Sequence, residues 1–187
     1  MSNTNSQYDE VINQCRNIFI DKTRDYGTSW RVLRQISITD QLYIKALRIR
    51  TIQEKGTQKI NEDIYGEFRA MINYGIIGLI QLSLPDKIEE LSLESALHLY
   101  DEKAGFARSI MEDKNHDYGE AWRNMSLQSF VDLILMKLLR VRQILANDGK
   151  TIISEGIDSN FVDIINYSVF ALILAKAVPA LKDQSAL

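Results

Sequence analysis

Apolar and polar residues along the chain recur with the spacing of α-helices, and the same pattern occurs in both halves. No segment alternates apolar and polar residues in the way that indicates a sheet. Three helices are predicted in each half, over 8–24, 37–54 and 63–82 and then over 93–116, 129–146 and 160–178. Gly27 and Gly119 are placed to end the first helices in a left-handed turn. The pattern predicts an all-α fold.

The starts of the second helices have their own signal. Ser37 and Ser129 are each followed three residues later by an aspartate, Asp40 and Asp132, which resembles a capping box. We expect these serines to cap the second helix of each half.

The two halves also carry the same polar residues at the same spacings, which indicates an internal duplication. One segment recurs 92 positions later, so that Asp25-Tyr26-Gly27-x-x-Trp30 becomes Asp117-Tyr118-Gly119-x-x-Trp122. After one inserted residue the offset becomes 93, and Glu62 and Asn73 recur as Glu155 and Asn166. Repeat 1 is assigned to 1–83, the linker with the start of the next helix to 84–99, and repeat 2 to 100–187.

A single three-helix unit of this size would bury too little apolar surface to be stable alone. We therefore expect the two halves to form one compact domain, a helical bundle in which a pseudo-two-fold axis relates the repeats. The third helices contain the most apolar runs, at 76–80 and 169–175. They are expected at the centre of the bundle, beside the second helices.

Composition narrows the class of partner. Hydrophobic residues make up 45% and charged residues 25% of the chain, as in a soluble globular protein. The net charge is -3 and no basic stripe is present, so a nucleic-acid polymer is not expected as a partner. The apolar runs are too short to span a bilayer and the first residues show no targeting signal. These features predict a cytoplasmic protein that does not bind membranes, with a homo-oligomer left open.

The second helices hold the first candidates for chemistry. Each is largely apolar but carries two cations three residues apart, Lys45 with Arg48 and Lys137 with Arg140. Neighbouring cations on an apolar helix need an anion, which is either a protein carboxylate or a bound phosphate. A structural ion-pair network and a phosphate-binding site both remain open. For Lys137 the expected protein partners are Glu155, Asp163 and Asp117, and for Lys45 they are Glu62, Asp25 and Glu67.

Acidic, amide and aromatic residues supply the other candidates. Five carboxylates are candidate catalytic residues: Glu155, Asp163, Asp117, Glu62 and Asp25. Four residues are candidate contacts to a base or substrate: Asn166, Asn73, Trp122 and Trp30. For the asparagines a buried hydrogen-bonding role inside the core is the alternative, and for the tryptophans a packing role is. The sequence contains no phosphate-binding loop, no dinucleotide fingerprint, no zinc-ligand cluster and no nucleophile elbow.

The combined motifs resemble a known family. Lys-x-x-Asp-Tyr-Gly-x-x-Trp-Arg, then Asp-x4-Lys-x-x-Arg, then Glu followed by Asn-Tyr is similar to the nucleotide modification associated domain type one family, here in duplicated form. The resemblance covers both repeats. It implies a role in nucleotide metabolism, with a nucleotide or another small phosphorylated ligand as the partner.

A more distant resemblance is to the MazG-like all-α nucleoside triphosphate pyrophosphohydrolases, carried by Asp163-Ile-Ile-Asn166-Tyr167. It implies a MazG-like bundle and a Mg²⁺ or Mn²⁺ ion held by Glu155 and Asp163. The chain departs from the metal motifs of those enzymes. Lys-x-x-Arg replaces the first motif, Glu-x-x-Glu, and the second, Glu-x-x-Asp, is divided between Glu67-x-x-Ala70 and Asn160-x-x-Asp163.

Three functions are compatible with these residues. The leading hypothesis is a nucleotide-processing protein, such as a metal-dependent nucleotide pyrophosphohydrolase. The alternatives are a non-catalytic module that binds an anion or nucleotide, and a structural helical assembly protein. Because repeat 2 has Asp163 where repeat 1 has Ala70, repeat 2 is expected to carry the more active site, with Lys137, Arg140 and Glu155.

Overall fold

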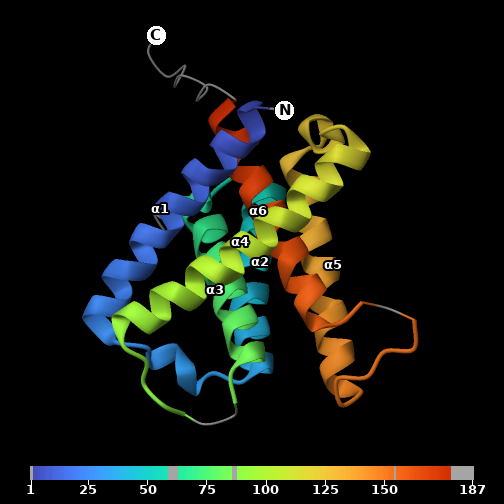
Figure 1. Ribbon diagram of the computed structural model, residues 1–187. Coiled ribbons are helices and arrows are strands. Elements are labelled where there is room, and N and C mark those ends of the chain that lie inside the picture. Colours follow the sequence, from blue (N-terminus) through green and yellow to red (C-terminus); the bar gives the residue numbers. More distant parts are fainter. Residues whose placement is uncertain (1, 59–62, 86–87, 154, 178–187) are drawn as a thin grey trace.

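Six α-helices account for most of the computed structural model, which describes residues 2–58, 63–85, 88–153 and 155–177 (Figure 1). They are α1 (Ser2–Tyr26), α2 (Gln35–Lys55), α3 (Ile64–Ser83), α4 (Leu93–Tyr118), α5 (Leu127–Ala146) and α6 (Ile157–Ala177). Two short 3₁₀ helices, η1 (Ser29–Val32) and η2 (Ala121–Asn124), follow α1 and α4. The described residues contain no β-strand, so the predicted all-α duplication is confirmed.

The first helices end where the sequence predicted, whereas the second helices begin at other residues than predicted. Gly27 and Gly119 have φ values of 60° and 61°, and both end the first helices as expected. The second helices begin earlier than predicted, at Gln35 and Leu127. In repeat 2 the capping serine is Ser126, whose hydroxyl accepts the backbone N–H of Ser129.

The proposed capping boxes are therefore wrong, because their aspartates have other partners. Asp40 of α2 binds Arg142 of α5 at 2.7 Å, and Asp132 of α5 lies 3.6 Å from Arg50 of α2. These two ion pairs are equivalent under the duplication, and they connect the second helices of the two repeats.

The central layer of the bundle is formed by α3 and α6, which make the most extensive contact between any two elements. Each is covered by the second helix of its own repeat, α2 on α3 and α5 on α6, and α2 and α5 also pack on each other. The remaining helices, α1 and α4, contact each other and both central helices (Figure 1). The expected central position of the third helices is confirmed, and every helix packs against its counterpart in the other repeat, which is consistent with a pseudo-two-fold axis.

Two glycines allow the central helices to approach closely. A Cβ atom at Gly75 would lie 2.7 Å from Cγ1 of Ile165, and one at Gly78 would lie 2.8 Å from the ring of Phe161. No side chain larger than hydrogen fits at these two places without movement of α6. The contact buries a continuous core that includes Phe68 and Phe161.

Buried hydrogen bonds link each first helix to the third helix of the other repeat. The Tyr8 hydroxyl donates to Oδ1 of Asn166 at 2.7 Å, and the Tyr100 hydroxyl donates to Oδ1 of Asn73 at 2.8 Å. The amide nitrogens of both asparagines donate to backbone carbonyl groups of α4 and α1. We call these two sets the reciprocal tyrosine–asparagine links. They tie the repeats together through their interior.

Two ion pairs on the surface also connect the repeats, through their first helices. Arg16 of α1 binds Asp101 of α4, and Arg108 of α4 binds Asp9 of α1, with closest distances of 2.6 and 2.7 Å.

One helix, Ile157–Lys176, is long and apolar enough to cross a membrane. Because 72% of that span is buried inside the bundle, it has the character of a core helix.

Candidate functional site

In repeat 1 the two cations of the second helix share one carboxylate. Nζ of Lys45 lies 3.2 Å from Oε2 of Glu67, and Arg48 donates to Oε1 of the same residue. The Glu67 side chain is largely buried at the start of α3. The expected pairing of Lys45 with Glu67 is confirmed. Of the other proposed partners, Asp25 is exposed near the end of α1 and Glu62 lies outside the described residues.

In repeat 2 the carboxylate comes from a different position. Nζ of Lys137 lies 2.5 Å from Oδ2 of Asp163, and Nζ of Lys114 lies 2.6 Å from Oδ1. Lys137 and Asp163 are both buried, with 8% and 4% of their surface exposed, whereas the Lys114 side chain is half exposed. The expected pairing of Lys137 with Asp163 is confirmed. Asp163 is thus shared between Lys137 of α5 and Lys114 of α4.

A shift of one helical turn separates the two arrangements. Glu67 aligns with Asn160, and Ala70 aligns with Asp163, so the carboxylate of repeat 2 lies three residues later on its helix. From there it reaches Lys114 of α4 and not the arginine of the cation pair. Arg140, the counterpart of Arg48, is exposed and forms no ion pair or side-chain hydrogen bond with another residue in the part of the chain that the structure describes.

The charges in repeat 2 influence each other. Partial burial acts to lower the pKa of Lys114, but the hydrogen bond and charge of Asp163 outweigh it and hold that pKa above its ordinary value. Burial, aided by Asp163, raises the pKa of Tyr167, although Lys114 and Arg140 act in the opposite direction. Lys114 is therefore a firm cation at neutral pH, and Tyr167 carries an intact hydroxyl.

These groups border a cavity of about 500 Å³, which we call the repeat-2 cleft. Its charged and phenolic lining comes from α4, α5, α6 and the segment before α6: Lys114, Tyr118, Lys137, Glu155, Asp163 and Tyr167. The structure thus brings together five of the residues predicted for repeat 2: Lys137, Glu155, Asp163, Asn166 and Trp122. Asp117 does not join them, because its side chain is 76% exposed and contacts His116.

The predicted metal site does not fit these residues. Each carboxylate oxygen of Asp163 already forms an ion pair with a lysine ammonium group, and a metal ion there would have to displace one of them. Within the described segments, no group of three or more His, Cys, Asp or Glu side chains is arranged to hold a metal. Glu155 and Asp163 therefore do not form a site for resident Mg²⁺ or Mn²⁺.

The predicted base contacts have structural roles in this arrangement. Asn73 and Asn166 use both ends of their amides in the reciprocal tyrosine–asparagine links. Trp122 is 7% exposed, stacks on Phe170 with ring centroids 4.2 Å apart, and donates its indole N–H to the Asn115 side chain. The geometry favours the core alternative for the asparagines and the packing alternative for this tryptophan.

Trp30 is partly buried in repeat 1 and packs on Phe19, with ring centroids 6.3 Å apart. It is not part of the lining of the repeat-2 cleft, and its indole N–H is buried without a hydrogen-bond partner among the described residues.

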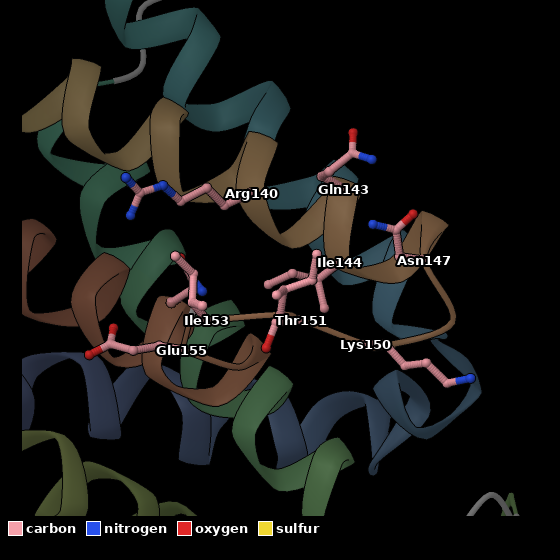
Figure 2. A pocket seen from close by; sticks show the side chains of 10 residues that line it. Arg140, Gln143, Ile144, Asn147, Lys150, Thr151, Ile153 and Glu155 are labelled. Atoms are coloured by element: carbon pink, nitrogen blue, oxygen red, sulfur yellow. The ribbon is translucent and has the colours of Figure 1, made fainter.

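A second cavity of about 620 Å³ adjoins the repeat-2 cleft and shares Glu155 with it (Figure 2). We call it the loop pocket. Its walls are the last turns of α5 (Arg140, Gln143, Ile144), Asn147 directly after that helix, residues 150–153 and 155 of the following loop, and Asn160 of α6. Figure 2 shows Arg140 and Glu155 at one side and Lys150 at the other. Sequence reasoning missed this pocket, although the adjacent apolar residues Ile152 and Ile153 in a polar loop were a signal of it.

Comparison with known proteins gives one match. The family model described as nucleotide modification associated domain 1 matches residues 22–82 and again residues 114–174. The chain belongs to this family. Both matched ranges contain the cation pair and the carboxylate of their repeat, and the family indicates a nucleotide-related role. No curated protein and no solved structure matches the chain significantly.

Proposed function

We propose that the chain binds nucleotides and that repeat 2 holds their phosphate groups. The observation that carries the proposal is the difference between Arg48 and Arg140. Arg48 shares the Glu67 carboxylate, whereas the aligned position in repeat 2 is the neutral Asn160, and Arg140 is left exposed beside the cleft. A phosphate oxygen at that place supplies the negative charge that repeat 2 lacks, and guanidinium groups bind phosphate through paired N–H donors.

The other cations of the cleft have distinct roles in this proposal. Lys137 is buried against Asp163, so it contributes a fixed charge and a rigid wall. Lys114 is held by the same carboxylate while half of its side chain remains exposed, so it can also contact a ligand. Side chains that are positioned before binding lose little conformational entropy when the ligand arrives. Asp163 is thus a positioning residue for two lysines.

The two other functions are less well supported. A purely structural bundle would pair its cations internally and leave no cavity, whereas Arg140 is exposed and two cavities border the cluster. A metal-dependent pyrophosphohydrolase needs carboxylates for its ion, and both oxygens of Asp163 are engaged. A divalent ion would have to arrive with the nucleotide phosphates, as Mg²⁺ often does. Binding is therefore the function that the residues favour.

Calorimetric titration with pyrophosphate and with nucleoside mono-, di- and triphosphates tests the proposal. Asn160→Glu restores the residue of repeat 1, and its carboxylate should occupy Arg140. Since a charge-assisted hydrogen bond contributes about 1.5–3 kcal/mol, affinity should fall roughly 10- to 100-fold. High salt should also weaken binding to the wild type.

Glu67→Asn is the matched control, because it makes the reciprocal exchange in repeat 1 and should leave binding at repeat 2 in place. Arg140→Met should weaken binding without altering the fold, since the side chain is exposed. A wild type that binds none of these phosphates, or an Asn160→Glu variant that binds them undiminished, would contradict the proposal.

A further inference from the structure

Asn160 has a buried acceptor without a partner. Only 3% of the residue is exposed, and its amide nitrogen donates to the carbonyl of Gly156 at 2.7 Å. Its Oδ1 accepts no hydrogen bond from the residues that the structure describes. Rotating the amide by 180° would place Oδ1 against the carbonyl oxygen of Gly156, so this orientation of the amide is fixed. Buried acceptors are nearly always satisfied, so this oxygen points to a ligand group that donates.

Apolar walls stand next to this acceptor in the loop pocket. Ile144 lies on α5, and the neighbouring Ile152 and Ile153 of the loop are 100% and 95% exposed (Figure 2). Two adjacent isoleucines in full contact with water gain stability when a ligand covers them. Apolar side chains with a few polar groups between them are the usual lining of a site for a heterocyclic ligand.

We infer that the loop pocket binds the nucleobase and that Oδ1 of Asn160 accepts a hydrogen bond from an exocyclic amino group, as adenine and cytosine carry. The inference rests on the proposed function, because Arg140 lines the same pocket and Glu155 borders both cavities. Phosphates bound beside Arg140 and Lys114 leave the loop pocket as the adjoining space for the base.

The chemistry of Asn160 also sets a preference among bases. One N–H of its amide donates to the carbonyl of Gly156 and its Oδ1 is unpaired, so the acceptor is the group of this side chain that lacks a partner. An amino group offers N–H donors to it, whereas a carbonyl group at the same place would oppose one oxygen to another. A buried polar group left unpaired costs enough to separate such analogues clearly.

Matched ligand pairs test this preference: adenosine with inosine monophosphate, and cytidine with uridine monophosphate. Each pair differs by an amino group replaced with a carbonyl. The wild type should bind the amino member of at least one pair about tenfold or more tightly. Pyrophosphate serves as the probe without a base.

Asn160→Leu should abolish the preference while pyrophosphate still binds. Ile153→Ser changes an exposed loop residue, so the fold is retained, and it should weaken every nucleotide but not pyrophosphate. Equal binding of both members of each pair by the wild type, with pyrophosphate bound, overturns this inference and leaves the proposed function standing. Loss of pyrophosphate and nucleotide binding together in the wild type defeats both.

Discussion

Asp163, only 4% exposed, accepts a hydrogen bond from Lys114 and forms an ion pair with Lys137. A carboxylate and an ammonium group lose much of their hydration on burial, and each then depends on the other for compensation. Lys137 has no other ion-pair partner among the described residues. The fold is therefore expected to depend on both charges of the buried pair, since removing either one leaves the other buried without a counter-charge.

Asp163→Asn should lower the free energy of unfolding by about 3–5 kcal/mol, because the Lys137 ammonium group stays buried without its anion. Denaturant unfolding followed by circular dichroism measures the loss. Asp40→Asn is the control, since it breaks the half-exposed pair with Arg142 and should cost about 1 kcal/mol or less. If both variants unfold at the same denaturant concentration, Lys137 reaches water more freely than its burial indicates.

At this scale the sequence was partly sufficient. Lys137 had to meet an anion because its helix is apolar, and Asp163 was among the partners expected for it. Lys114 could not be placed, because it comes from a helix whose crossing over α6 is set by tertiary packing. The orphaned acceptor of Asn160 was equally hidden, since whether an amide is satisfied depends on neighbours that no spacing in the chain reveals.

Among the elements, α3 and α6 are the pair whose separation depends most on residue size. Gly75 and Gly78 face Ile165 and Phe161 at distances that leave no room for a methyl group. Gly105, in α4, has open space around it. Glycine weakens a helix at all three positions. Only at Gly75 and Gly78 does close packing give a reason for it.

Gly75→Leu should destabilise the protein by about 1–3 kcal/mol, because the larger side chain forces the central helices apart. Gly105→Ala should have the opposite effect and stabilise it by roughly 0.5–1 kcal/mol through helix propensity. Thermal unfolding of the two variants beside the wild type gives both signs. A stabilising Gly75→Leu would show that the α3–α6 contact adjusts without strain.

The helices themselves could be predicted from their periodicity, and the central ones from their apolar runs. The starts of α2 and α5 could not, because a serine followed by an aspartate mimics a capping box. In repeat 2 the true cap, Ser126, lies three residues earlier, and Asp132 is drawn to Arg50 across the bundle. The local capping signal was therefore outweighed by an ion pair between two helices.

On the scale of the whole molecule, the repeats complete each other. The first helix of each repeat lies against the third helix of the other, and the reciprocal tyrosine–asparagine links and the Arg16 and Arg108 ion pairs cross between them. A repeat separated from its partner would expose the apolar face of its third helix and leave a buried asparagine unsatisfied. The pseudo-two-fold arrangement was predictable from the duplication, but the contact of each first helix with both third helices was not.

Two fragments cut in the linker, 1–88 and 89–187, should each fail to form a folded monomer. Mixing them should restore helical circular dichroism and a one-to-one complex on size-exclusion chromatography, because each supplies the surface that the other lacks. Tyr8→Phe and Tyr100→Phe should weaken that complex. Either fragment alone behaving as a stable helical monomer would show that the repeats are independent.

The reciprocal tyrosine–asparagine links also constrain how such a gene can change. A duplicated domain whose copies fold separately can discard one of them once a single binding site suffices. Here deletion of repeat 1 would remove Tyr8 from the interior of repeat 2, and deletion of repeat 2 would take Tyr100 from repeat 1. In repeat 1 the cations are neutralised by Glu67 of the same repeat, so its binding residues can change while its fold remains under selection.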